Sequence, residues 1–130
     1  ANNDPSDLFG MRVSIDGDTL AVSAKDEKSN QTTITNGTSA SSNNSNDNSG
    51  AVYVYKRTGT SWAQEAYIKA ANNDAHDQFG SALALDNASL AVGVIYEGSN
   101  QATITNGTSA SSNNSNAYSG AAYVYTLTGE

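Results

Sequence analysis

The chain is built from one unit of 70 residues that occurs almost twice. The segment Ala1–Asp4 returns as Ala71–Asp74, and every later correspondence keeps the same offset of 70 without an insertion or deletion. A fixed period is typical of repeat architectures, in which each unit buries its apolar surfaces against its neighbours. We therefore predict two repeats, residues 1–70 and residues 71–130, and expect the function to reside in an assembly of such units.

The charge and composition argue against several classes of protein. Thirteen acidic and 6 basic side chains give a net charge of -7, whereas nucleic acids and anionic membranes attract clustered Lys and Arg. No segment is long and apolar enough for insertion into a membrane. The absence of Cys excludes a disulfide framework and thiolate metal sites. We expect a soluble extracellular protein. Because the chain starts within a repeat motif and without a leader, we also expect it to be a piece of a longer protein.

The apolar pattern of the first repeat predicts four antiparallel strands. Alternating apolar residues flank the turn signal Asp16-Gly17-Asp18, and in the second copy Asn87 replaces Gly17, which is consistent because both residues tolerate positive φ. A polar stretch from residue 25 to 49 reads as a long loop. The expected strands of the first repeat are Met11–Asp16, Thr19–Ala24, Gly50–Lys56 and Trp62–Lys69, the last at the outer edge.

The second repeat carries only three of these strands. Its expected strands cover residues 81–85, 90–93 and 121–125, and the chain ends where a fourth would begin. No segment has the spacing of an amphipathic helix. Four-stranded sheets repeated along a chain are the blades of a β-propeller. We therefore predict an all-β fold of two tandem four-stranded antiparallel propeller blades, of which the second lacks its outer strand and has an open edge.

Several motifs resemble the bacterial FG-GAP repeat, the blade type that also occurs in integrin α-subunit propellers. They are Phe9-Gly10, the hairpin Asp16–Ala24 and the segment Ser49–Tyr55, each with a counterpart in the second repeat. The resemblance implies a secreted or cell-surface propeller that binds proteins or glycans, often within a larger chain, and that has no enzymatic activity. Many FG-GAP blades hold Ca²⁺ in a D-x-D-x-D-G-x-x-D loop. That loop is missing here, so the integrin-type metal site is not carried over.

The long loop is the best-preserved part of the repeat. Residues 33–46 recur unchanged as residues 103–116, although loops normally diverge faster than the strands they join. A recent duplication in low-complexity sequence explains this identity, and so does a loop that packs in a defined way or forms a shared surface. Under the second interpretation, the apolar Ile34 and Ile104 anchor each loop onto its blade. The candidate interaction residues are Ile34, Asn36, Asn43, Asn44, Ile104, Asn106, Asn113 and Asn114.

The polar loop also has the groups that bind sugars or calcium. Amides and hydroxyls hydrogen-bond sugars and supply neutral oxygen ligands to Ca²⁺, which usually needs several carboxylates as well. The alternative is a solvated loop whose Asn and Gly residues only satisfy turns. The candidate calcium ligands are Asp26, Glu27 and Asp47 in the first repeat and Glu97 in the second.

No constellation of catalytic residues is apparent. The single histidine, His76, corresponds to Ser6 in the other repeat, and no G-x-S-x-G nucleophile motif is present. We interpret the acidic pairs before each Phe-Gly as turn caps between blades. The aromatic residues are interpreted as inter-blade packing, with a stacking platform for sugar rings as the alternative; they are Phe9, Tyr53, Tyr55, Phe79, Tyr123 and Tyr125.

Three functional hypotheses follow from this sequence. A propeller blade has two faces that each need a neighbour, so two blades alone leave two apolar faces in water. The chain is then part of a larger adhesin-like propeller whose other blades lie in a parent chain, or a subunit that self-assembles into a ring or an extracellular fibre. The third hypothesis is a lectin-like, carbohydrate-binding module that uses the polar loops to bind a glycan or a surface protein.

Overall fold

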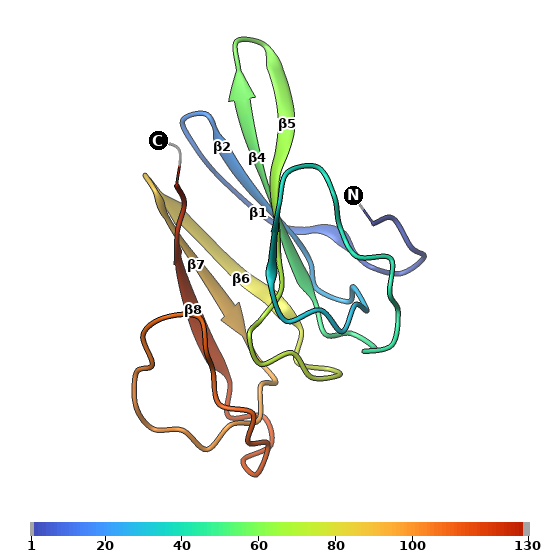
Figure 1. The fold of residues 1–130 in the computed structure, drawn as a ribbon, viewed down its shortest axis with the longest axis vertical. Coiled ribbons are helices and arrows are strands. Elements are labelled where there is room, and N and C mark those ends of the chain that lie inside the picture. Colours follow the sequence, from blue (N-terminus) through green and yellow to red (C-terminus); the bar gives the residue numbers. More distant parts are fainter. Residues whose placement is uncertain (1, 129–130) are drawn as a thin grey trace.

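The protein consists of two antiparallel β-sheets, one from each repeat (Figure 1). A computed structural model describes residues 2–128, and these residues contain strands but no helix, so none that could cross a membrane. The all-β prediction is confirmed. The first sheet contains β1 (Phe9–Asp16), β2 (Thr19–Ala24), β3 (Ile34–Asn36), β4 (Ala51–Thr58) and β5 (Ser61–Ile68), and the second contains β6 (Phe79–Asp86), β7 (Ser89–Val94) and β8 (Ala121–Thr126).

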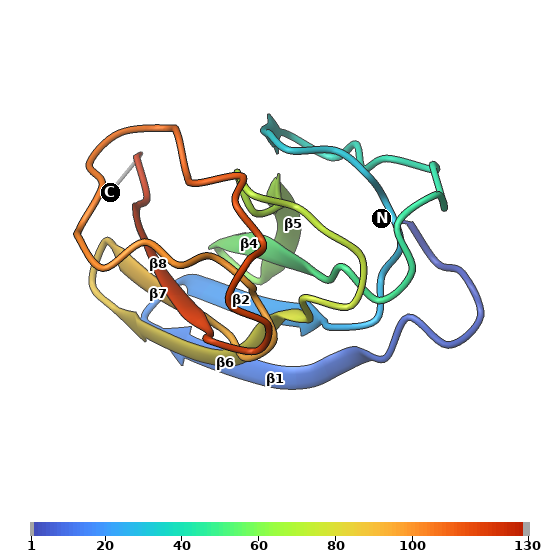
Figure 2. The ribbon, with the colours of Figure 1, turned by 90° about the horizontal axis from the view of Figure 1, so that it is seen from below.

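The two sheets repeat the same topology. The first has the strand order β1-β2-β4-β5-β3, and the second has the order β6-β7-β8, which matches the β1-β2-β4 part of the first. The sheets stack so that β6 lies against β1 and β2, as Figure 2 shows. This stacked arrangement of blade-like units agrees with the predicted propeller architecture.

Backbone angles show that the first hairpin has the same conformation in both repeats. Gly17 and Asn87 occupy the same position of the hairpin turn, with φ of 54° and 52°, as the sequence predicted. Asparagine is one of the few residues other than glycine that adopts this left-handed region at low cost. The agreement extends to Gly10 and Gly80, with φ of 92° and 94°. In this hairpin, differences in burial between the repeats therefore reflect their surroundings and not a different local fold.

The first sheet has one strand that the sequence did not predict. Residues Ile34–Asn36 of the long loop form β3 and pair with β5, with Ile34 opposite Ile68. Consequently β5 is not the outer edge that we expected for this segment. The reason is local, because Thr33-Ile34-Thr35 is a short β-branched run with high strand propensity inside an otherwise polar loop.

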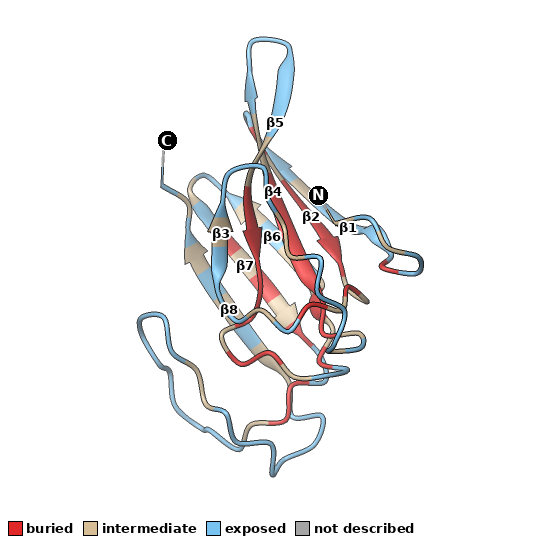
Figure 3. Ribbon diagram, turned by 45° about the vertical axis from the view of Figure 1, so that its right-hand side comes forward, coloured by how far each residue is buried: buried red, intermediate tan, exposed pale blue. Residues whose placement is uncertain are grey.

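The main hydrophobic core lies between the two sheets. Figure 3 shows buried residues concentrated on β2, β4 and β5, whereas β1 is largely exposed. A smaller cluster on the opposite face of the first sheet contains Tyr53 and Tyr67. The buried residues of the main core are Ala21, Val52, Val54, Ala66, Ile68, Ala70, Phe79, Leu90, Val92 and Val94.

Candidate association surfaces

The contact between the repeats shows how one unit stacks on the next. Small and medium side chains of the first repeat meet larger side chains of the second, so the two surfaces interdigitate. We call the first kind of surface the C-face and the second kind the N-face. The C-face of the first repeat comprises Ala21, Val52, Val54, Ala66 and Ile68, and the N-face of the second comprises Phe79, Leu83, Leu85, Leu90 and Val92.

Two glycines allow the repeats to approach closely. A Cβ on Gly80 would lie 2.8 Å from the Cβ of Ser23, and a Cβ on Gly50 would lie 2.2 Å from the carbonyl oxygen of Phe79. Both glycines belong to the motifs that recur at an offset of 70. The Phe-Gly motif of one repeat thus packs directly against the glycine that precedes β4 in the repeat before it.

Among the described residues, none packs on the N-face of the first repeat in this way. Phe79 is completely buried, whereas its counterpart Phe9 is 50 % exposed. Val13 and Ile15, the counterparts of Leu83 and Leu85, are 64 % and 62 % exposed. A Cβ on Gly10 would meet no atom within 4 Å, in contrast to Gly80. This N-face, formed by Phe9, Val13, Ile15, Leu20 and Val22, is therefore an apolar surface that is shaped for packing but partly open to water.

The C-face of the second repeat is open in the same way. Val124 is 74 % exposed, whereas its counterpart Val54 is 1 % exposed under the second repeat. Ala122 is exposed as well, although its counterpart Val52 is completely buried. This C-face is formed by Ala91, Ala122 and Val124, and within residues 2–128 no strand corresponding to β5 widens it.

Polar contacts from the linker between the repeats hold the first loop in place. The side-chain amide of Asn73 donates hydrogen bonds to the carbonyl oxygens of Ser29 (2.9 Å) and Gln31 (2.6 Å). In return, the side chain of Asn46 donates to the carbonyl oxygen of Asn73 at 2.8 Å. As a result Ser49 is buried, while its counterpart Ser119 is exposed. The second repeat therefore orders the loop of the first.

A buried ion pair fastens the end of β5 beneath the same loop. The Nζ of Lys69 lies 2.7 Å from Oε2 of Glu27, and both side chains are completely buried. Lys69 also donates to the Ser49 hydroxyl at 2.8 Å, and the backbone N–H of Ser29 donates to the Glu27 carboxylate at 3.1 Å. Desolvation lowers the pKa of Lys69, and the Glu27 carboxylate opposes that effect. The pair locks β5 to the start of the loop.

The structure gives the four candidate calcium ligands separate partners. Asp26 pairs with Lys25 at 3.0 Å, and Glu27 pairs with Lys69. The carboxylate of Glu97 accepts from the Asn72 side chain at 2.7 Å. The fourth candidate, Asp47, accepts a hydrogen bond at its backbone carbonyl. Among residues 2–128, no three acidic, His or Cys side chains gather closely enough to share a metal ion.

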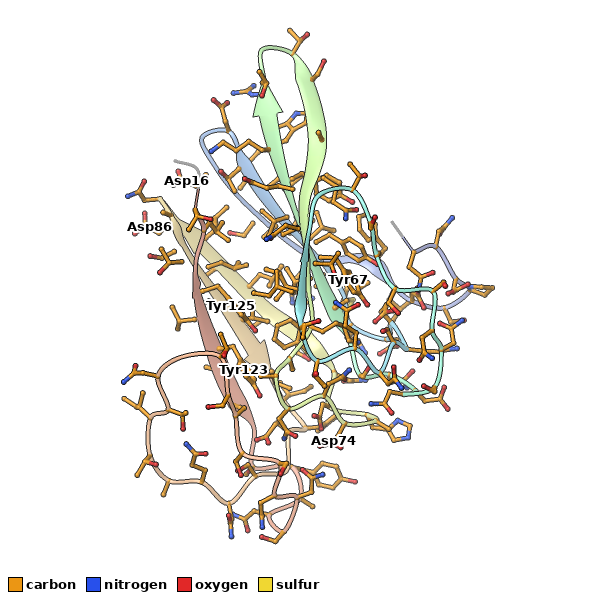
Figure 4. The ribbon with its side chains drawn as sticks, in the orientation of Figure 1. Asp16, Tyr67, Asp74, Asp86, Tyr123 and Tyr125 are labelled. Carbon is orange, nitrogen blue, oxygen red and sulfur yellow. The ribbon has the colours of Figure 1, made fainter. Side chains whose placement is uncertain are left out.

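The candidate loop residues make both local contacts and contacts with distant parts of the same repeat. Asn44 donates to Asp4 at 3.1 Å, and Asn114 makes the equivalent bond to Asp74, which Figure 4 labels, at 2.9 Å. Asn43 and Asn113 each accept hydrogen bonds from the serine two residues later. Asn36 ends β3, whereas Asn106 lies in no strand. Ile34 is 48 % exposed and Ile104 is 90 % exposed, so only the first loop rests on a strand.

The candidate packing aromatics form one cluster in each repeat. Phe9 meets Tyr53 edge-on at 5.4 Å, and Phe79 meets Tyr123 edge-on at 5.7 Å. Tyr123 and Tyr125 extend from β8 toward the first sheet (Figure 4) and pack against the main core. Burial raises the pKa of Tyr123 to about 12. Tyr55 packs at the margin of the smaller cluster that contains Tyr53 and Tyr67.

Asp77, two residues before Phe79 of the Phe-Gly motif, leads us to expect a pH-dependent stability. It is 4 % exposed, and burial raises its pKa from 3.8 to about 6. The folded state thus keeps a proton between about pH 4 and 6 that the unfolded chain loses, so this group lowers stability as the pH rises through that window. We expect Asp77→Asn to remove this slope and to stabilise the protein by about 2–3 kcal/mol near pH 7.

Urea unfolding of both proteins at several pH values measures the effect of Asp77. The asparagine still accepts the hydrogen bond that the backbone N–H of Asp74 donates to the Asp77 carboxylate at 3.2 Å. Asp86→Asn, at an exposed carboxylate at the end of β6, is the matched control and should leave the slope of the wild type. Parallel pH profiles for the wild type and Asp77→Asn would contradict the prediction.

Comparison with known families adds to this geometry. A family model described as FG-GAP repeat matches residues 2–55. These residues form an FG-GAP repeat. The predicted family is therefore confirmed for these residues, and the match covers β1, β2, β3 and most of β4. Searches of curated proteins and of solved structures found no significant match. The second FG-GAP-like unit lies outside the matched residues but carries the same Phe-Gly, hairpin and Ser-Gly-Ala motifs.

Proposed function

We propose that this chain is a non-enzymatic FG-GAP module that works by association, through stacking of its open faces on the faces of other FG-GAP units. These units come from further copies of the chain, so that the N-face of one copy packs on the C-face of the next. The remaining blades of a parent propeller would use the same two faces. We also propose an extracellular or cell-surface location, which rests on the resemblance to secreted FG-GAP propellers.

One observation carries this proposal. The chain contains one completed stacking contact and, on its two outer faces, the two halves of a second one. Val54 in the completed contact is 1 % exposed, whereas its counterpart Val124 on the open C-face is 74 % exposed. Likewise, Phe79 is 0 % exposed and its counterpart Phe9 on the open N-face is 50 % exposed. Burying an aliphatic side chain of this size contributes about 1.5–3 kcal/mol, so covering both faces is strongly favourable.

The geometry of such an association is head to tail. Two different surfaces meet, so the contact is heterologous and each added copy presents a new open face. If the rotation from each copy to the next brings the last copy back to the first, the result is a ring of blades. If it does not, the result is a fibre. In both assemblies every copy contributes one N-face and one C-face.

Blocking one face at a time tests the association. We expect the wild type to form oligomers in light scattering after size exclusion, and Val124→Asp to be a folded monomer because the charge lies on the C-face. Val13→Asp blocks the N-face and should also be monomeric. A mixture of the two variants retains one intact N-face and one intact C-face and should form a heterodimer that grows no further.

The control and the contrary result are equally direct. Thr38→Asp places the same charge on an exposed loop outside both faces and should leave the oligomers unchanged. A wild type that stays monomeric across the accessible concentration range would overturn association between copies. Oligomers that persist in both single variants would show that other surfaces hold the chains together.

A further inference from the structure

A groove lies beside the open edge of the second sheet. It has a volume of about 1030 Å³, and its lining includes Glu97, Ile104, Ser119, Tyr123 and Tyr125. One wall is β8 and another is the second long loop, which bows away from β8 in Figure 1. Residues 32–34 and Lys69 of the first repeat also line the groove, and Lys69 is already paired with Glu27. The first long loop instead lies alongside β5. The groove therefore occupies the position in the second repeat that β5 fills in the first.

Both walls correspond to the two strands that hold β5 in the first repeat. On one side β5 pairs with β4, which is the counterpart of β8. On the other side β5 pairs with β3, whose counterpart is the loop segment 104–106. Among the described residues β8 pairs only with β7, so its outer edge has backbone N–H and C=O groups that are open to another strand.

The groove also contains a buried charge without a counter-charge. Glu97 is 3 % exposed, and its Oε1 accepts hydrogen bonds from the side chain of Asn72 (2.7 Å) and the backbone N–H of Ser99 (3.0 Å). No Lys, Arg or His of the described residues forms an ion pair with it. Its counterpart Glu27 has an equivalent hydrogen bond from Ser29 and, in addition, the buried Lys69. A buried carboxylate is costly unless it is paired, so Glu97 favours a cation in the groove.

We propose that the groove binds an extended peptide strand with the chemistry of β5. The strand pairs antiparallel with β8 and presents an aromatic side chain to Tyr123 and a lysine to Glu97. The lysine of the peptide lies beside Glu97 in the same way as Lys69 lies beside Glu27 in the first repeat. It donates a second hydrogen bond to the Ser119 hydroxyl, as Lys69 does to the Ser49 hydroxyl. This is recognition by strand addition, in which backbone pairing provides affinity and the alternating side chains provide specificity.

The partner is therefore defined by sequence pattern. In the register of β5, Ala66 pairs opposite Val54, Tyr67 opposite Tyr53 and Ile68 opposite Val52, and Lys69 follows. The pattern of a partner is a small residue, an aromatic residue, an aliphatic residue and a lysine, in that order. This proposal concerns the edge of the second sheet and goes beyond the stacking of faces, so either can hold without the other.

A synthetic peptide tests the proposal. The peptide has the sequence of residues 60–70 with blocked ends, and the receptor is the Val13→Asp chain, whose substitution lies on the far sheet and suppresses stacking. We expect saturable 1:1 binding in calorimetry and slowed amide exchange in β8 but not in β1. The same peptide with methionine in place of its lysine should bind at least tenfold more weakly, because Glu97 then remains unpaired.

A receptor variant assigns the lysine effect to Glu97. In a Glu97→Gln receptor the lysine and methionine peptides should bind with similar affinity, because the carboxylate that distinguishes them is gone. The proposal would be overturned if the lysine peptide did not bind, or if both peptides bound with equal affinity to the receptor that retains Glu97. A peptide of the same composition in scrambled order controls for unspecific attachment to an open edge.

A fused strand keeps the test decisive if the free peptide is poorly soluble. Thr128-Gly129 corresponds to Thr58-Gly59 in the turn before β5, so residues 61–70 can be added directly after Glu130 in the native register. The fusion should raise the melting temperature, and the same fusion with methionine for lysine should raise it less. Equal melting temperatures for the fused and unfused chains would contradict the proposal, whatever the oligomeric state of the wild type.

Discussion

Gly50→Ala is expected to lower the free energy of unfolding by about 3–5 kcal/mol. The new Cβ would lie 2.2 Å from the carbonyl oxygen and 2.6 Å from the backbone nitrogen of Phe79. Backbone atoms cannot rotate away as a side chain does, so the second sheet must shift off the first and expose the main core. Gly50 also has φ of 87°, which adds local strain for any residue with a Cβ.

The control for Gly50 is its own counterpart. Gly120 has a similar φ of 77°, but a Cβ there would lie 3.3 Å from its nearest neighbour, the carbonyl oxygen of Val94. Gly120→Ala thus carries the backbone strain with little of the clash and should cost about 1–2 kcal/mol. Chemical unfolding of both variants measures the difference. Equal losses would show that the close approach of the repeats is not the reason for glycine at this position.

Lys69→Met should destabilise the protein by about 3–5 kcal/mol, because it leaves the Glu27 carboxylate buried without its partner. Methionine retains much of the length of the lysine side chain, so the loss reports mainly on the charge. The Nζ of Lys69 lies 2.7 Å from Glu27 and is completely buried, so water cannot replace it without opening the loop. Thermal and urea unfolding both measure the loss.

A second substitution separates the charge from the packing. Glu27→Gln in the Lys69→Met background removes the unpaired charge and should recover a large part of the lost stability. The coupling between the two positions is then far from additive, as expected for a buried pair. Additive effects of Lys69→Met and Glu27→Gln would contradict the assigned role of the pair.

The sequence predicted the parts of the fold that depend on local patterns. Alternating apolar residues and a two-residue turn locate the hairpin of β1 and β2, and the tolerance of asparagine for positive φ anticipated the turn at Asn87. The offset of 70 placed the three strands of the second sheet. Structural features that depend on residues close together in the sequence could therefore be predicted without a structure.

Contacts between residues far apart in the sequence could not be predicted in the same way. Lys69 read as the polar end of an edge strand and Glu27 as a candidate calcium ligand, although the two form one ion pair across 42 residues. The strand at Ile34 was also missed, because its three residues become a strand only when β5 provides a partner. The burial contrast between Phe9 and Phe79, which carries the proposed function, depends on neighbours and leaves no mark in either motif.

The hydrogen bonds of Asn73 make the stability of each repeat depend on the repeat that follows it. Because this linker residue secures the carbonyls of Ser29 and Gln31 in the preceding loop, each repeat depends for its full cooperativity on the repeat that follows it. In an array of such units, the loop of the last repeat always lacks this support. Local opening would then start at the C-terminal unit and travel backwards, so that the array frays from one end while the other stays intact.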